Sequence, residues 1–176
     1  MTDQTLTDAR TPTGRLTPAR RAGLTLFVVC AVQFLDAMDA ASMGPALPKI
    51  QHDLGMSPSA LQWIVSAYVL GFGGFLLLGG RLADLVHRRH LLVTWLLIFA
   101  VASLAGGLAT SGPLLVGARL LKGLSAAFTA PAALAILLDT YREEEERNRA
   151  LGHYLAIAST GFVLGLVVGG VLASAS

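Results

Sequence analysis

The chain has 176 residues, of which 54% are hydrophobic and only 14% are charged, and its formal net charge is +2. About a quarter of the residues of a soluble domain are charged, so this composition, with a mean hydropathy of +0.65, indicates a membrane protein. The small net charge argues against nucleic acid as a partner, and the single cysteine, Cys30, excludes an internal disulfide and a cysteine-cluster metal site.

Residues 1–22 are polar, rich in threonine and arginine, and are expected to form a cytoplasmic tail. Residues 23–176 contain five long apolar stretches, each long enough to cross a hydrocarbon core of about 30 Å as a helix. These stretches lie at about 23–47, 60–80, 91–109, 113–138 and 150–174. The sequence therefore predicts an all-α integral membrane protein with five transmembrane helices.

The basic residues predict the orientation of these helices. Ten arginines lie in the N-terminal tail and in the second and fourth connections, whereas the first connection has only Lys49 and the third has none. Because lysine and arginine are retained on the cytoplasmic side, we expect a cytoplasmic N-terminus. We also expect the protein to reside in the plasma (inner) membrane.

The first apolar stretch carries two acids, Asp36 and Asp39. One charged residue near the centre of a membrane helix costs about 2.5–3.5 kcal/mol, so both acids must be protonated, paired or facing a wet cavity. Gln33, Asp36 and Asp39 follow one another at intervals of three residues and therefore share one side of the helix. We expect this polar stripe to face the protein interior.

The fourth stretch carries two bases, Arg119 and Lys122, which are also three residues apart. From a rise of about 1.5 Å per residue, Arg119 lies at a depth similar to that of Asp39, and Lys122 at one similar to that of Asp36. We therefore predict the pairs Asp39–Arg119 and Asp36–Lys122. Two interpretations stay open: ion pairs that only fix packing, or a proton or cation site, which we favour because intramembrane ionisable groups are usually functional.

The remaining patterns lie in the second connection and the fifth stretch. A cytoplasmic loop explains the arginines of 79–92, but not Asp84 within the compact order Gly80-Arg81-Leu82-Ala83-Asp84. In the fifth stretch Gly161, Gly165 and Gly169 recur at every fourth residue, which is a small-residue face that lets another helix approach closely.

Taken together, residues 23–176 resemble the major facilitator superfamily. The segment 80–92 is similar to its signature connection, G-x-L-[AGS]-D-[RK]-x-G-R-[RK], although Leu85 and His87 depart from it. The matching residues are Gly80, Leu82, Ala83, Asp84, Arg88 and Arg89. The resemblance implies that the acid and the arginines of this connection help to lock the transporter closed toward the inside.

Three further motifs point to the drug:proton antiporters of the superfamily. Arg119 and Gly123 match the motif of the fourth helix, in which Lys122 replaces a common Gln. The antiporter motif of the fifth helix, G-x8-G-x3-G-P-x2-G-G, is matched in register except that Leu166 replaces the proline. Asp39 and Pro48 match the first-helix motif of the fourteen-helix multidrug efflux branch, while its Thr and Asn positions are lost. The glycines matching the fifth-helix motif are Gly152, Gly161, Gly165, Gly169 and Gly170.

The resemblance implies a secondary transporter that exports drugs or other amphipathic small molecules in exchange for protons, without a cofactor or metal. In this hypothesis Asp39 exchanges the proton, Arg119 tunes it, Asp36 binds a proton or cationic substrate, and Lys122 completes the site. We expect an N-terminal fragment of the helix bundle that stops before the sixth helix and lacks the C-terminal half.

The alternatives are a sugar or metabolite transporter of the same superfamily, or a truncated membrane protein that does not transport. An enzyme is not expected, because the sequence shows no nucleophile–base pair, metal cluster or phosphate loop.

Overall fold

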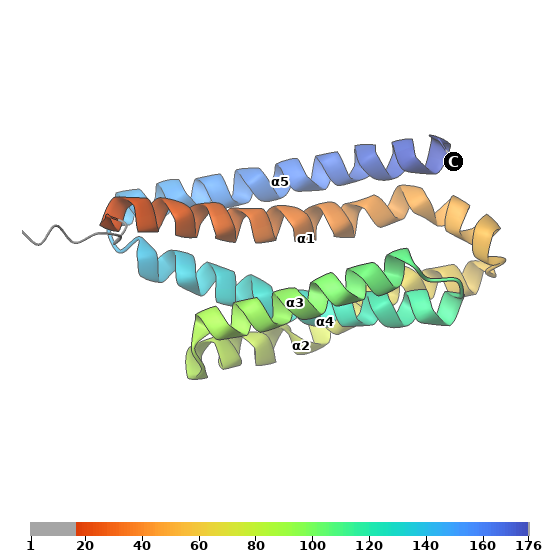
Figure 1. Ribbon diagram of the computed structural model, residues 1–176, viewed down its shortest axis with the longest axis horizontal. Coiled ribbons are helices and arrows are strands. Elements are labelled where there is room, and N and C mark those ends of the chain that lie inside the picture. The colour runs from red at the N-terminus through yellow and green to blue at the C-terminus, as the bar shows by residue number, and fades with distance from the viewer. Residues whose placement is uncertain (1–16, 176) are drawn as a thin grey trace, which may run out of the picture.

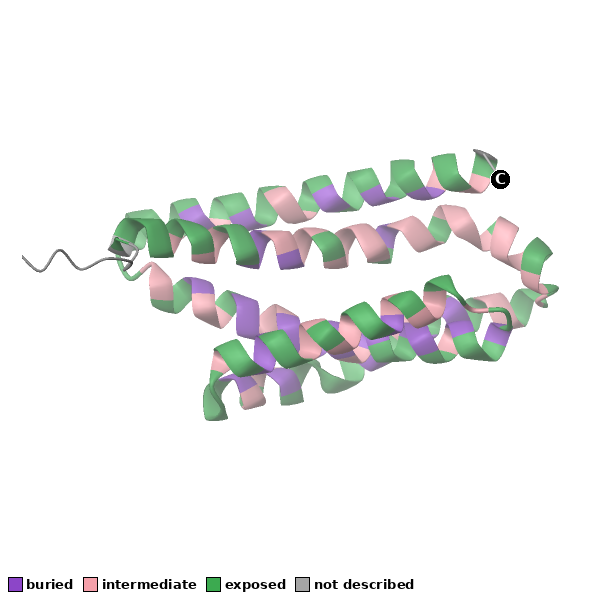
Figure 2. Cartoon of the chain, in the orientation of Figure 1, coloured by how far each residue is buried: buried purple, intermediate pink, exposed green. Residues whose placement is uncertain are grey.

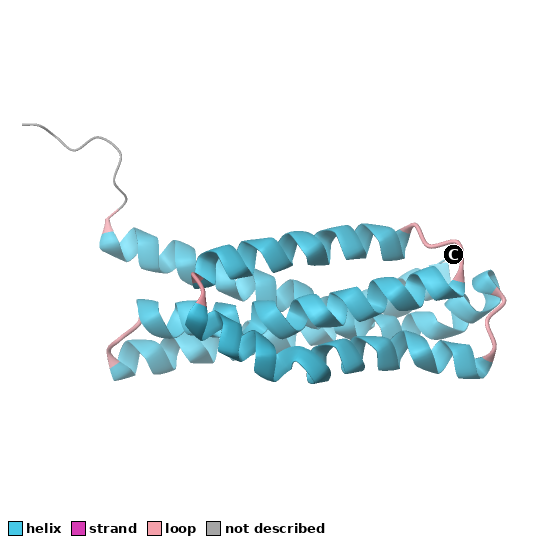
Figure 3. Cartoon of the chain, turned by 90° about the horizontal axis from the view of Figure 1, so that it is seen from below, coloured by secondary structure: helices cyan, strands magenta, loops and turns pink. Residues whose placement is uncertain are grey.

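The computed structural model describes residues 17–175, and this part of the chain is folded into five helices joined by short connections (Figures 1 and 3). The helices are α1 (Pro18–Leu54), α2 (Pro58–Leu85), α3 (Arg88–Gly107), α4 (Gly112–Thr140) and α5 (Glu144–Ala175). All five are long and apolar enough to cross a membrane. The predicted all-α fold class is confirmed, and each expected apolar stretch overlaps one observed helix.

Helix α1 is longer at both ends than expected. Residues 18–22 of the expected tail belong to it, and the side chain of Thr17 accepts a hydrogen bond from the Arg20 backbone N–H at 3.4 Å. At its other end α1 continues through Pro45 and Pro48 and bends there (Figure 1), as expected where proline removes helical hydrogen bonds. The rest of the expected tail, including Arg10 and Arg15, lies outside the described residues.

The connection expected over 79–92 is mostly helical. Helix α2 runs to Leu85 and α3 begins at Arg88, so the two helices are separated by Val86 and His87 alone. The signature motif therefore lies on the ends of two helices, which fixes its side chains more firmly than a long loop would.

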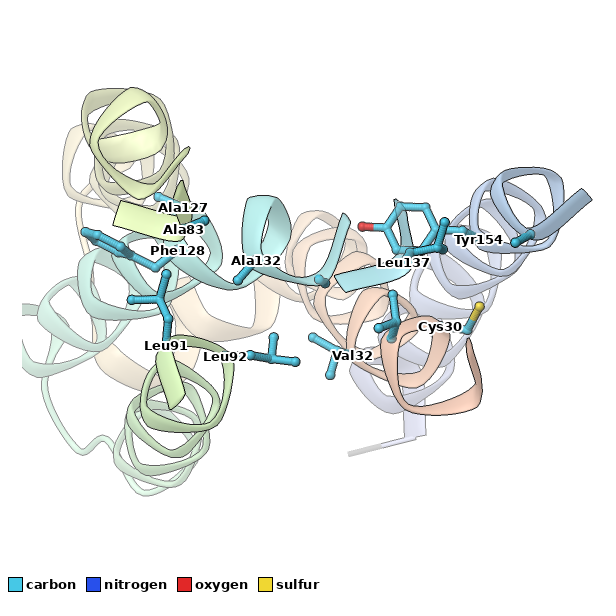
Figure 4. Close-up of a cluster of buried hydrophobic side chains, with 13 residues drawn as sticks. Cys30, Val32, Ala83, Leu91, Leu92, Ala127, Phe128, Ala132, Leu137 and Tyr154 are labelled. Carbon is cyan, nitrogen blue, oxygen red and sulfur yellow. The ribbon is translucent and has the colours of Figure 1, made fainter. Parts of the chain in front are cut away.

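The helices form two groups. Helix α1 packs along α5, while α2 and α3 both pack on α4, and the two groups lie in separate layers in Figure 1. Buried residues concentrate on α4 (Figure 2), which contacts every other helix. In Figure 4, Ala132 of α4 lies between Phe128 and Leu91 on one side and Leu137 and Tyr154 on the other. Helix α4 thus joins the two groups through one continuous apolar core.

Glycine permits the close approach of α2 to α4. A methyl group added at Gly71 would lie 2.6 Å from the carbonyl oxygen of Leu120, and one at Gly79 or Gly123 would meet the backbone of the facing helix at Ala127 or Tyr68. Because the obstacles are backbone atoms, any side chain at these positions would push the helices apart. Sequence reasoning had not assigned a packing role to Gly71 or Gly79.

Candidate functional site

The polar stripe of α1 reaches three different helices. The hydroxyl of Tyr154 on α5 donates a hydrogen bond to Gln33, and the hydroxyl of Tyr68 on α2 donates one to Asp36 at 3.1 Å. Asp39 binds α4. The stripe therefore faces the interior, and its polar contacts connect α1 to both helix groups.

Asp39 is held by two cations. Its carboxylate accepts a hydrogen bond from Nη1 of Arg119 at 3.0 Å, and its other oxygen accepts one from Nζ of Lys122. The side chains of Arg119 and Lys122 are only 3% and 8% exposed, whereas that of Asp39 is 20% exposed. The depth argument correctly placed Arg119 beside Asp39, but it did not place Lys122 there.

The predicted Asp36–Lys122 pair is wrong. Lys122 also donates a hydrogen bond to Oγ of Ser103 at 3.2 Å and lies 5.1 Å from the ring centre of Phe99, so its ammonium group is directed toward α3. Among the described residues, Asp36 forms no ion pair and has the neutral Tyr68 as its hydrogen-bond donor. The prediction used only depth along the helices and did not consider the side of α4 from which Lys122 projects.

Arg119 has unused hydrogen-bonding capacity. Its Nη2 atom is buried and has no hydrogen-bond partner among residues 17–175. The guanidinium lies 6.0 Å from the ring centre of Tyr68, where the face of an aromatic ring attracts a cation. A buried cation with a free donor needs its anionic partner, so Arg119 depends on Asp39.

Two cavities flank the cluster formed by Asp36, Asp39, Arg119 and Lys122. One of about 390 Å³ lies between α1, α3 and α4 and is lined by Asp39, Arg119 and Lys122. The other, of about 370 Å³, lies between α1, α2, α4 and α5, has a mostly apolar lining and also touches Arg119. Asp39, Arg119 and Lys122 thus border a cavity of mixed polar and apolar lining, and Arg119 also borders a mostly apolar one.

The signature motif converges on Arg88. This side chain donates hydrogen bonds to the carbonyl oxygens of Ala83 at 3.1 Å and Ala135 at 3.3 Å, and it pairs with Asp139 of α4. Asp84 lies further away, at 3.8 Å. Asp139 was not foreseen from the sequence, although it is an acid at the end of the helix that packs on α2.

Within residues 17–175, two members of the motif, Gly80 and Arg89, do not take part in the contacts of Arg88. Arg89 is exposed, and a methyl group added at Gly80 would meet no other atom within 4 Å. Gly79, which precedes the motif, contacts the backbone of α4 instead of Gly80.

Three of the five motif glycines of α5 pack directly on α1. Gly161, Gly165 and Gly169 are buried, and methyl groups added there would meet the carbonyl oxygens of Phe34, Met38 and Ser42. Gly152 has no atom within 4 Å of such a methyl group, and the nearest atom to one at Gly170 is 3.9 Å away. The four-residue spacing therefore predicted a real helix contact.

Sequence reasoning missed the neutral partners of the charged cluster: Tyr68, Phe99 and Ser103. The sequence offered one indication for Tyr68 and Ser103: both lie in apolar stretches, and a buried tyrosine or serine hydroxyl needs a hydrogen-bond partner. The helix that supplies that partner cannot be derived from one sequence.

Comparisons with known proteins agree with the fold. A family model described as "Major Facilitator Superfamily" matches residues 29–176. The puromycin resistance protein of Streptomyces alboniger is 46% identical over 147 residues, covering 84% of this chain and 29% of that protein. The cephamycin export protein of Amycolatopsis lactamdurans is 41% identical over 159 residues, covering 90% of this chain and 33% of that protein. The chain thus spans about a third of the length of these relatives.

Among solved structures, a bacterial homologue of the human lysosomal transporter Spinster, in an inward-facing and unoccupied conformation, superposes with a TM-score of 0.66. It is 23% identical, and the superposition covers 89% of this chain and 31% of that one. This likeness supports the helical arrangement.

Proposed function

Because the chain belongs to the major facilitator superfamily, we propose that it forms the N-terminal part of a proton-coupled exporter of amphipathic drug-like molecules. The observation that carries this proposal is the cluster of Asp36, Asp39, Arg119 and Lys122, buried between apolar helices and bordered by two cavities. Such a set of charges is costly in a membrane, and intramembrane ionisable groups usually serve a function such as transport.

The relatives support export as the direction of transport. Two of them are named for puromycin resistance and for cephamycin export, and a third is a multidrug resistance protein of Mycobacterium tuberculosis, 37% identical over 149 residues. Their names describe different molecules, which suits a site defined by charge and apolar space more than by a fixed set of hydrogen bonds.

In the proposed mechanism, the cluster exchanges protons for substrate as two helix bundles rock about a midplane site. Asp39 neutralises one of the two positive charges of Arg119 and Lys122, and Asp36 is a second acid beside them. Further helices beyond this chain complete the cavity, and the connection around Arg88 contacts them. The substrate, protons and lipid bilayer are the expected partners.

Efflux by the complete exporter tests the function. Inverted membrane vesicles with an imposed pH gradient should accumulate the cationic dye ethidium, and collapsing the gradient should abolish uptake. Asp39→Asn should abolish uptake too, because it leaves two buried cations without their anion. Ethidium uptake by wild-type vesicles that does not depend on the pH gradient would contradict the proposal. Normal gradient-dependent uptake by Asp39→Asn would also contradict it.

We further propose that the protein resides in the plasma membrane with its N-terminus in the cytoplasm. The concentration of arginines in alternate connections supports this orientation. An epitope tag before residue 1 should be digested by protease in inverted vesicles and protected in intact cells. The reverse pattern would overturn the orientation.

A further inference from the structure

Arg89 is a residue of the signature motif whose exposed side chain has no partner among residues 17–175. The neighbouring Arg88, by contrast, donates to the carbonyl oxygen of Ala135 and pairs with Asp139 of α4. Arg89 lines a cavity of about 380 Å³ between the α2–α3 connection and the C-terminal end of α4. We infer that this cavity binds the phosphate of an anionic phospholipid, with one acyl chain of that lipid lying along α3. The site is separate from the charged cluster proposed for transport.

The lining of the cavity complements a phosphodiester in charge and hydrogen bonding. Arg88 and Asp139 offset each other in its wall, so Arg89 supplies an unbalanced positive charge. Asp84, the acid of the connection, lies 3.8 Å from Arg88 and does not line the cavity. The ring of His87 caps no backbone group of α3, and an imidazole can donate a hydrogen bond even when it is neutral. A phosphodiester carries a single negative charge and accepts such hydrogen bonds, so it matches these groups.

An exposed apolar stripe runs along α3 from Arg89. Val93, Leu97 and Val101 follow at intervals of four residues, so they share one face of the helix. Their exposed fractions are 51%, 63% and 64%, so the described helices leave most of this face uncovered. From Arg89 to Val101 the helix rises by about 18 Å, close to the roughly 15 Å of hydrocarbon in one leaflet of a bilayer. A charged end followed by an apolar stripe of this length suits a phospholipid.

An anionic phospholipid fits this surface better than a soluble anion or a zwitterionic lipid. A soluble phosphate would fill the cavity but make no use of the stripe on α3. Phosphatidylcholine carries a quaternary ammonium group next to its phosphate, which Arg89 would repel. In the proposed orientation the α2–α3 connection faces the cytoplasm, and anionic lipids of that leaflet attract arginines near the membrane surface. The site therefore selects a lipid such as phosphatidylglycerol, whose headgroup adds no positive charge.

The test is lipid binding to the complete exporter, purified in detergent and observed by native mass spectrometry during addition of dioleoyl phosphatidylglycerol. Arg89→Gln should lower the affinity for this lipid about fivefold, which is the contribution of one arginine near an anionic surface. Its melting temperature should not change, because Arg89 has no partner to lose within the described chain. Arg89→Lys keeps the charge and should keep most of the affinity. Leu97→Ala, which shortens the stripe, should cause a smaller decrease.

Three controls separate this site from general attraction between arginines and lipids. Arg81→Gln is the matched control, because Arg81 is an exposed arginine of the same connection that does not line the cavity. It should keep the wild-type affinity. Dioleoyl phosphatidylcholine should bind Arg89→Gln and wild type equally, and glycerol 1-phosphate, the free headgroup, should not displace phosphatidylglycerol.

Four results would overturn the inference. Wild-type affinity in Arg89→Gln would exclude the cavity, and an equal loss in Arg81→Gln would show that charge alone attracts the lipid. Displacement by glycerol 1-phosphate would make this a site for soluble phosphate. Unchanged binding by Leu97→Ala would show that no acyl chain lies on the stripe, as expected if further helices of the exporter cover it. Binding is measured without transport, so a failure to export ethidium would overturn the proposed function alone.

Discussion

Replacing Gly165 by alanine tests the contact between α1 and α5. Gly165 is buried, and a methyl group there would collide with the carbonyl oxygen of Met38 and lie 2.9 Å from Cβ of Ala41. Carbon atoms are at optimal separation at about 3.5–4.0 Å, so the two helices would have to separate by about 0.6–1 Å. The obstacles belong mainly to the backbone of α1, which cannot rotate away as a side chain can.

The size of the effect follows from this overpacking. Forcing an extra methyl group into a well-packed contact costs about 1–3 kcal/mol. Alanine regains about 1 kcal/mol of helix propensity over glycine, so the net cost is about 0–2 kcal/mol. At about 2–4 °C per kcal/mol for a chain of this size, the melting temperature should fall by up to about 8 °C. The reduction combines the strain at Gly165 with lost packing along α1.

Gly152→Ala is the matched control on the same helix. A methyl group at Gly152 has no neighbouring atom within 4 Å, so the change removes only the low helix propensity of glycine, worth about 1 kcal/mol. The control should therefore melt a few degrees higher. Thermal unfolding in detergent, followed by the fluorescence of Trp63 and Trp95, measures both variants. If Gly165→Ala also melts higher than wild type, the inferred close approach of α1 and α5 is wrong.

The remaining predictions concern α2 and its contacts. Gly79→Ala should lower the melting temperature, because its methyl group would meet the backbone of α4. Gly80→Ala, where a methyl group meets no atom within 4 Å, should not lower it. Equal shifts of the melting temperature in the two variants would refute the assigned contact. Arg88→Ala should destabilise the chain by about 1–2 kcal/mol in chemical denaturation, because it removes hydrogen bonds to two helices. Asp139→Asn should lower the free energy of unfolding by less than about 1 kcal/mol, because that acid is exposed. Asp84→Asn should lower it still less, because Asp84 lies further from Arg88, and a larger effect at Asp84 than at Asp139 would contradict the geometry.

The sequence alone determined the features that depend on one helix at a time. Apolar length predicted five membrane helices, and the four-residue spacing of Gly161, Gly165 and Gly169 predicted a face for close packing, which is the face that meets α1. The three-residue spacing of Gln33, Asp36 and Asp39 predicted one inward polar stripe. Each of these features follows from helix periodicity, which a sequence displays directly.

The tertiary structure decided which groups meet across helices. Depth along the membrane matched Asp39 with Arg119, but it could not show that Lys122 turns toward α3 and also reaches Asp39. Nor could it show that Tyr68 of α2 reaches Asp36. The position of a residue along its helix follows from a rise per residue, whereas its partner depends on the rotation and placement of neighbouring helices. Packing across the whole bundle sets that rotation, and it makes Asp39 the bridge and leaves Asp36 with a neutral partner.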